Sequence, residues 1–279
     1  RDLVRSRGLG DVYKRQVKAI ANTSGLDICG YVDCDLDYLM PNYDQVAEFI
    51  QSIDKPEESV FLLTHIGGWV NPDIESIANL CREKGIALVE DCAHSLGSLL
   101  NGKHTGLFGD AGVYSLYATK TIPAGEGGIV VTNDNMLFEM VQKFSIYDRF
   151  DQKLNLGVNI RMSELNALVS YSVISETESI IQNKYNIAKK YITACKEFNW
   201  EYIDPIKNGQ RSNFYKFTLI SRSISPINEF KQIKMRTSPV YDYSLGADLA
   251  EITKRHICLP IWYKLEDEVV KVVLAELVR

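Results

Sequence analysis

The chain has 279 residues, of which 46% are hydrophobic and 24% are charged, and its formal net charge is −5. This length suits one large domain or a large and a small one, and the composition is globular rather than disordered. The negative charge argues against a general nucleic-acid or anionic-membrane surface. No apolar run approaches the roughly 18 to 20 residues that a membrane-spanning helix requires.

Cysteine and histidine usage carries little chemistry by itself. The six cysteines form no CxxC pair, and most lie inside apolar runs, so we expect reduced core thiols in a cytoplasmic protein. The four histidines are scattered without an HxxxH spacing or paired cysteines. A zinc site is therefore a weak alternative, and we expect no metal.

Residues 1–16 (RDLVRSRGLGDVYKRQ) differ from the rest of the chain. They have no starting methionine, no apolar periodicity and an excess of arginine and lysine. A targeting peptide would need an apolar or amphipathic core, which is absent. Because the segment resembles a translated sequencing-adapter tail, we expect a non-native leader that takes no part in the fold.

From Val17 onward the pattern predicts an α/β fold with a mostly parallel sheet. Apolar runs of strand length alternate with amphipathic helical stretches, which is typical of βαβ units. We expect a large domain over residues 17–184 and a smaller α+β domain over residues 185–279. The expected strands are Cys29–Asp33, Ser59–Ile66, Ile86–Glu90, Val113–Leu116, Ile129–Thr132 and Phe214–Ile220; the expected helices are Asn42–Ile53, Pro72–Lys84, Asp134–Ile146, Ser163–Phe198 and Leu265–Leu277.

An acid, a hydroxyl and an amine follow two of these strands. Asp91 ends one strand, and Ser115 and Lys120 follow the next. Ligands of such sheets collect at the carboxyl ends of the strands. A carboxylate can hold a pyridine nitrogen protonated, a hydroxyl can bind phosphate, and a lysine of depressed pKa can form a Schiff base. Taken singly, Lys120 is more often a surface lysine, Asp91 a helix cap, and His94 a packed or exposed histidine.

Two other kinds of site are poorly matched. The sequence GEGG at 125–128 is no Walker loop and lacks the GxGxxG spacing, so its glycines more simply permit a sharp turn or a close approach to a ligand. The GxSxG motif of a Ser-His-Asp hydrolase is absent from the sequence.

Four motifs occur in order along the chain: EDCAHSLGS (90–98), FGDAGVYSLYATK (108–120), GEGGIVVTND (125–134) and GVNIRMSELNA (157–167). Taken together, they resemble the DegT/DnrJ/StrS family of pyridoxal-phosphate-dependent sugar aminotransferases. The resemblance extends from about Val17 to the C-terminus and includes LPIWYKL at 259–265. It implies a fold-type I enzyme that is a homodimer with shared active sites.

The resemblance also assigns roles to residues. It implies that Lys120 bonds to the cofactor and moves the proton, and that Asp91 pairs with the pyridine nitrogen. His94 corresponds to a family position, histidine or glutamine, beside the ring hydroxyl. Ser115 is implied in binding the phosphate, and Asn159 in reaching the cofactor of the neighbouring subunit.

The implied reaction moves an amino group from glutamate or glutamine, through pyridoxal 5'-phosphate, to a keto group of a nucleotide-linked sugar. Such a reaction serves amino-sugar or surface-polysaccharide synthesis. Lysine at position 120, where related sugar 3-dehydratases have histidine, favours transamination. Cyclitol amination remains an alternative. A non-catalytic relative is another, although a scaffold has no need of Asp91, Ser115 and Lys120.

The chain departs from the family pattern at its beginning. The family's phosphate-binding SGT loop and the aromatic side chain that stacks on the cofactor ring lie upstream of the segment matching Val17. We therefore expect an N-terminally truncated member, which folds poorly and binds the cofactor poorly by itself.

Overall fold

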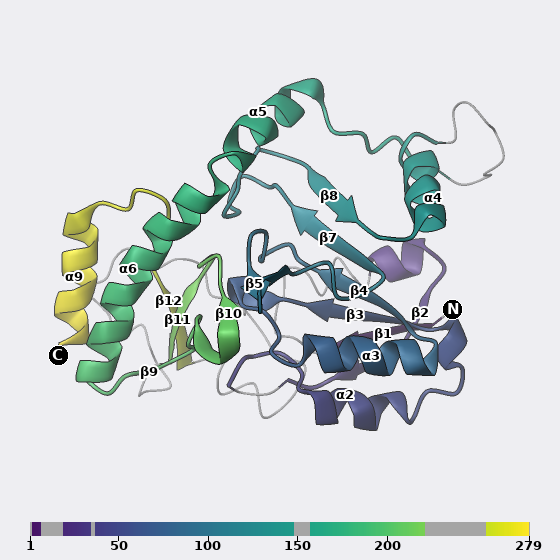
Figure 1. Ribbon diagram of the computed structural model, residues 1–279, viewed down its shortest axis with the longest axis horizontal. Coiled ribbons are helices and arrows are strands. Elements are labelled where there is room, and N and C mark those ends of the chain that lie inside the picture. The colour runs from purple at the N-terminus through teal and green to yellow at the C-terminus, as the bar shows by residue number, and fades with distance from the viewer. Residues whose placement is uncertain (1, 7–18, 35–36, 148–156, 221–254, 279) are drawn as a thin grey trace.

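The computed structural model describes residues 2–6, 19–34, 37–147, 157–220 and 255–278. Its main sheet has six strands among these residues, in the order β2-β1-β3-β4-β7-β8 (Figure 1). All neighbours are parallel except β7 and β8, which confirms the mostly parallel α/β sheet. The strands are β2 (Asp27–Val32), β1 (Asp2–Ser6), β3 (Val60–Thr64), β4 (Ala87–Asp91), β7 (Ala111–Ser115) and β8 (Gly128–Val131).

The expectation that residues 1–16 take no part in the fold is wrong for Asp2–Ser6. These residues form β1, in which Leu3 is in register with Ile28 on one side and Val60 on the other. A strand at this place provides backbone partners for both β2 and β3, which would otherwise face a gap. Residues 1 and 7–16 lie outside the described residues, and a non-native origin of the leader stays a prediction.

Helices α2 (Tyr43–Ile50) and α3 (Ile74–Lys84) lie together on one face of the main sheet (Figure 1). A capping box starts α2, with Asn42 and Gln45 each bonded to the other's backbone N–H. Helix α3 ends at Gly85, whose φ of 73° is left-handed and favours glycine. Apolar side chains of α3, such as Ile74 and Ile77, pack on Phe61 and Leu88 of the sheet.

Beyond β8, the chain forms α4 (Asn135–Ser145), α5 (Glu164–Ile174) and α6 (Thr177–Glu197). The sequence predicted one helix from Ser163 to Phe198, and the structure breaks it after Ser175. Hydroxyl groups around the break bond to backbone carbonyls three residues earlier, including that of Ser175 on Ser172 and that of Thr177 on Ile174. Such bonds compete with continuous helix.

The C-terminal part of the described chain forms a second sheet and a second core. Strands β12 (His256–Leu259), β11 (Phe217–Ile220) and β9 (Glu201–Tyr202) are antiparallel, in that order. Helices α6 and α9 (Asp267–Leu277) lie side by side and share this core (Figure 1). The predicted domain boundary at residues 184 and 185 falls inside α6 and stays a prediction.

Short elements connect the two parts. A three-stranded sheet in the order β10-β5-β6 joins residues of the C-terminal part to the loops of the main sheet. The short elements are β5 (Leu99–Leu100), β6 (Lys103–His104), β10 (Gln210–Arg211) and the 3-10 turns Pro56–Glu58, Ile66–Gly68 and Lys207–Gly209.

Among the described residues, no helix combines the length and apolarity needed to cross a bilayer.

Candidate active site

Asp91 and Ser115 lie at the carboxyl ends of adjacent parallel strands, as the sequence predicted. Asp91 of β4 is in register with Val113 of β7, two residues before Ser115. The Asp91 carboxylate accepts hydrogen bonds from the Ala93 N–H at 3.0 Å and the Thr64 hydroxyl at 3.4 Å. Parallel strands present their carboxyl ends on one edge of a sheet, so both side chains are available to one ligand.

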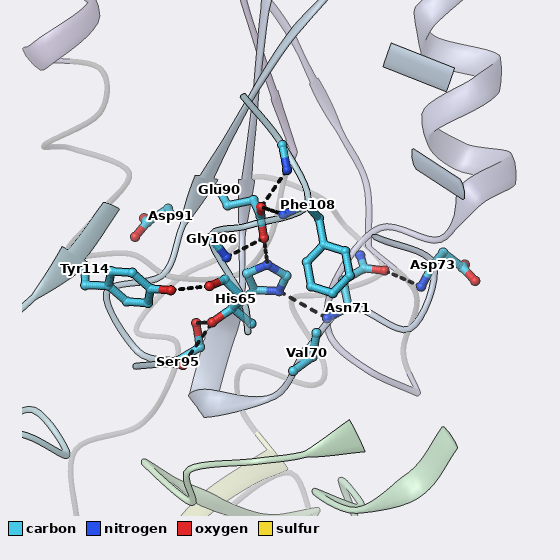
Figure 2. A network of polar contacts seen from close by, with 12 residues as sticks. His65, Val70, Asn71, Asp73, Glu90, Asp91, Ser95, Gly106, Phe108 and Tyr114 are labelled. Carbon is cyan, nitrogen blue, oxygen red and sulfur yellow. Dashed lines mark hydrogen bonds and ion pairs between the residues drawn. The ribbon is translucent and has the colours of Figure 1, made fainter. Parts of the chain in front are cut away.

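The neighbouring acid, Glu90, points to the other side of β4. Figure 2 shows the Glu90 and Asp91 side chains extending in opposite directions from the strand, as consecutive strand residues do. Glu90 is fully buried and accepts four hydrogen bonds. They come from the backbone N–H groups of Gly106, Phe108 and Gly109, each at 2.7 Å, and from the His65 ring at 2.9 Å.

These bonds keep Glu90 ionised. Burial alone raises its pKa, but the hydrogen bond and positive potential of His65 and the backbone N–H groups outweigh burial, and the net pKa is lowered. The other nitrogen of His65 accepts the N–H of Asn71 at 3.2 Å. His65 Nε2 is therefore the nitrogen that donates to the Glu90 carboxylate (Figure 2).

The same cluster contains the only grouping of metal-ligating atoms among the described residues. His65, Glu90 and Cys92 have one ligand atom each within 4.8 Å of one another, and all three are buried. Both His65 nitrogens and both Glu90 oxygens already take part in the hydrogen bonds described. Burial also raises the pKa of the Cys92 thiol well above its usual value.

His94 lies beyond the end of β4 and is a half-buried neutral imidazole. Its Nδ1 accepts the N–H of Gly67 at 3.3 Å, which places the proton on Nε2. Burial, assisted by the positive charge of Lys216, lowers the pKa of His94 to about 3. The Nε2–H is thus a donor at any ordinary pH.

Lys120 lies in the loop between β7 and β8. Backbone bonds from Ala118 N–H to Gly125 and from Ala124 N–H to Leu116 close this loop at 3.0 Å and 2.8 Å. The side chain is buried, and burial followed by the charge of Lys216 lowers the pKa of Lys120 to about 8. A lysine with a depressed pKa and a fixed position is what the sequence predicted here.

Tyr215 contacts both His94 and Lys120, and no pattern in the sequence singled it out. Its ring lies 4.4 Å from that of His94, and the amines of Lys120 and Lys216 each lie 5.3 Å from its centroid. Tyr215 comes just before β11, so the C-terminal sheet supplies one wall of the site. A local signal was absent because the contact joins residues about a hundred positions apart.

A cavity of about 570 Å³ opens beside Lys120. That volume is typical of a small-molecule site. The lining residues are Ala118, Thr119, Lys120, Thr121, Pro123, Ser172, Val173, Glu176, Ile180, Lys184, Tyr215, Ile261, Trp262 and Tyr263.

The structure does not bring Asn159 to this cavity. Asn159 pairs with Ile146 in an isolated bridge between α4 and α5, is exposed, and accepts a hydrogen bond from Arg161 at 3.0 Å. The sequence expected Asn159 to act on a neighbouring subunit rather than on its own. That expectation stays a prediction.

The protein thus has a buried lysine in the loop after β7 and a carboxylate at the end of the adjacent strand β4, and comparison with known proteins gives the family. The model of the DegT/DnrJ/EryC1/StrS aminotransferase family matches residues 18–278. The chain belongs to this family.

Three relatives illustrate the match. The chain is 34% identical over 151 residues to a GDP-perosamine synthase of Vibrio cholerae, covering 52% of this chain and 40% of the relative. It is 31% identical over 228 residues to a UDP-4-amino-4,6-dideoxy-N-acetyl-beta-L-altrosamine transaminase of Helicobacter pylori, covering 75% of this chain and 59% of the relative. The structure of DesI in the presence of its TDP-sugar product has the same fold, with a TM-score of 0.85 and 21% identity. The match covers 99% of this chain and 74% of DesI. The chain spans about half the length of the curated relatives it matches.

Proposed function

We propose that the protein is an aminotransferase that uses pyridoxal 5'-phosphate to aminate a keto group of a nucleotide-linked sugar. The observation that carries the proposal is Lys120, a buried amine with a pKa of about 8 at the edge of a cavity of about 570 Å³. Removing a lysine ammonium from water costs free energy. Ionisable groups whose pKa values are strongly perturbed cluster at functional sites.

The residues at the strand ends fit this cofactor by their chemistry. The Asp91 carboxylate suits the pyridine nitrogen, the His94 Nε2–H suits the ring oxygen, and the half-buried Ser115 hydroxyl suits the phosphate. Pyridoxal phosphate, when bound, supplies an aldehyde that bonds to amines and a ring that withdraws electrons from them. The chain itself supplies orientation, exclusion of water and proton transfer.

Proton transfer falls to Lys120. With a pKa of about 8, its amine both accepts and donates a proton readily near neutral pH. Neutral His94 holds its Nε2–H as a fixed donor, because its other nitrogen is engaged by Gly67. The Asp91 carboxylate is oriented by its bonds to Ala93 and Thr64.

The substrate class rests on the relatives. Their names describe synthesis of GDP-perosamine and transamination of a UDP-linked amino sugar. We therefore assign a nucleotide sugar as the amino acceptor and glutamate or glutamine as the donor. A cyclitol acceptor is the second candidate within the same chemistry.

We further propose a homodimer with shared active sites. Helix α5 exposes Leu165, Leu168 and Tyr171, which are 76%, 67% and 81% exposed, and α4 exposes Met136 and Phe138. Exposed apolar side chains on these two successive helices are typical of an interaction site. In the dimer Asn159, which lies between these helices, extends toward the partner's cofactor.

We also place the protein in the cytoplasm. The buried thiols of Cys81 and Cys195 have pKa values that burial raises to about 12, so they act as inert apolar core groups. Core thiols of this kind suit a reducing compartment.

The test is amine transfer from glutamate or glutamine to a panel of keto-sugar nucleotides, with keto-cyclitols run in parallel. We expect transfer to a sugar nucleotide that depends on added pyridoxal phosphate and falls at least a thousandfold in Lys120→Met. Transfer to cyclitols alone would reassign the acceptor. Equal rates with and without Lys120 would overturn the proposal.

A further inference from the structure

Lys184 lies on the buried face of α6. Its neighbours on that face, Ile180, Ile187 and Ala188, belong to the apolar stripe of the helix, and Lys184 itself is only 3% exposed. Lysine is almost never buried to this degree without a partner that offsets the cost of removing its charge from water. The position therefore needs a reason beyond packing.

The ammonium of Lys184 has a neutral partner. It donates a hydrogen bond to the Thr121 hydroxyl at 3.2 Å. Among the residues that the structure describes, no carboxylate lies within ion-pair distance of it. Burial, followed by the charge of Lys216, lowers the pKa of Lys184 to about 7. One bond to a neutral hydroxyl does not offset such burial.

Both groups face the cavity of the proposed active site. Lys184 and Thr121 line it together with Lys120, Tyr215 and Trp262. The remaining lining has the carboxylate of Glu176, the hydroxyl groups of Thr119 and Ser172, and otherwise apolar or aromatic side chains. The Lys184 ammonium and the Thr121 hydroxyl lie on one wall of the cavity, and Lys120 is the residue next to Thr121 in the chain. The cavity therefore suits a ligand that carries a negatively charged group near the carbon that reacts with the amine of Lys120.

We infer that Lys184 is a substrate-binding residue, whose ammonium together with the Thr121 hydroxyl binds an anionic group, a carboxylate or a phosphate, of the molecule presented to Lys120. The inference deepens the proposed function and rests on it only for the role of Lys120. The binding of an anion at Lys184 is a separate property. A bound anion would give the buried Lys184 ammonium the negatively charged partner that no carboxylate of the described residues provides.

Two sources of such an anion exist in the proposed reaction. An amino-acid donor carries carboxylates, and a nucleotide-linked acceptor carries a diphosphate. Binding experiments on the 279-residue chain distinguish them with 2-oxoglutarate as the carboxylate probe and guanosine diphosphate as the diphosphate probe. Dissociation constants from calorimetry are compared for the unsubstituted chain, Lys184→Met and Thr121→Val.

We expect one of the two probes to bind, at least tenfold more weakly to Lys184→Met and several-fold more weakly to Thr121→Val. The matched control is Lys190→Met on the same helix, because Lys190 is half-exposed and pairs with Asp267 at 3.1 Å. The control should bind the probe unchanged. Loss with 2-oxoglutarate assigns the carboxylate, and loss with guanosine diphosphate assigns the phosphate.

A second measurement separates binding from folding. Methionine removes the buried charge and keeps the length of the side chain, so Lys184→Met should unfold at the same temperature as the unsubstituted chain or higher. Lys184→Met should also still bond covalently to pyridoxal phosphate at Lys120, which tests the proposed function independently. Absence of probe binding, equal binding by Lys184→Met, or a lower unfolding temperature with lost binding would each overturn the inference.

Discussion

The rings of His94 and Tyr215 lie 4.4 Å apart at an interplanar angle of 34°. The contact joins the loop after β4 of the main sheet to the segment that leads into β11 of the second sheet. The same tyrosine ring lies 5.3 Å from the Lys120 amine. Tyr215 thus contacts two of the residues that we assign to the cofactor and joins the two parts of the structure there.

Removing the Tyr215 ring should expose His94. In Tyr215→Leu, water reaches the imidazole, the cost of charging it falls, and the pKa of His94 rises from about 3 by at least about one unit. Titration of the His94 ring protons by NMR measures this change. Tyr215→Phe keeps the ring and serves as the control. An unchanged His94 pKa in Tyr215→Leu would show that the tyrosine does not seal the site.

Removing the charge of Lys216 should make Lys120 more basic. Burial is the larger cause of the depressed Lys120 pKa and Lys216 the second, so Lys216→Met should move that pKa from about 8 part of the way toward 10.5. A pKa rise of about one unit reduces the free amine at pH 7 about tenfold. The rate at which Lys120 bonds to pyridoxal phosphate, followed against pH, should fall accordingly.

Lys216→Arg is the control for this prediction, because it keeps a positive charge beside Tyr215. Its pH profile should resemble that of the unsubstituted chain. If the methionine variant shows the same midpoint as the arginine variant, the charge at position 216 does not act on Lys120.

The buried bond between Glu90 and His65 should be a main source of stability. In Glu90→Gln an NH₂ group replaces one carboxylate oxygen. This NH₂ then faces N–H groups whose hydrogen bonds the carboxylate accepted. The free energy of unfolding should therefore fall by about 3 kcal/mol. Urea denaturation at pH 7 measures the loss. Glu83→Gln, on the exposed side of α3, should change the free energy by less than about 0.5 kcal/mol.

The same pair gives a pH dependence with a definite sign. The pKa of Glu90 is lower in the folded chain than the usual 4.5, so its contribution is complete above that value. The contribution is lost as pH falls through the folded-state pKa. The difference in unfolding free energy between the unsubstituted chain and Glu90→Gln should therefore be constant from pH 6 to 7 and shrink below pH 4.5. A difference that grows on acidification would contradict the assignment of an ionised Glu90.

The exposed apolar face of α5 should determine the oligomeric state. Leu168→Glu introduces a charge in the middle of that face, where Leu168 is 67% exposed, and should shift a dimer to monomer in sedimentation analysis. Val272→Glu on α9 is the control, since Val272 is 53% exposed outside this face. Dimers that persist in Leu168→Glu would place the interface elsewhere.

Local signals in the sequence predicted much of the fold. The expected helix start at Asn42 and the expected helix end at Lys84 agree with the N-cap of α2 and the last residue of α3, because helix-end signals act over a few residues. The two-residue strands β5, β6, β9 and β10 were missed, since a pair of residues has no period. Strand β1 was missed because its sequence resembles a leader and its pairing depends on distant strands.

The site shows the same division. Asp91, Ser115 and Lys120 were proposed as site residues from their places after strands, whereas Tyr215 and Lys216 approach Lys120 through packing that no local pattern reveals. Lys184 did have a signal. It occupies a core position in the 3.6-residue period of α6, between Ile180 and Ile187, where an apolar residue is expected.

The central claim is that Lys120 bonds covalently to pyridoxal phosphate, and borohydride reduction tests it most directly. The chain is incubated with millimolar cofactor at pH 8, reduced, digested and mapped by mass spectrometry. We expect low affinity but a label concentrated on Lys120, and a loss of that label in Lys120→Met without a gain elsewhere. A label spread over exposed lysines, or no label on Lys120 at saturating cofactor, would contradict the account.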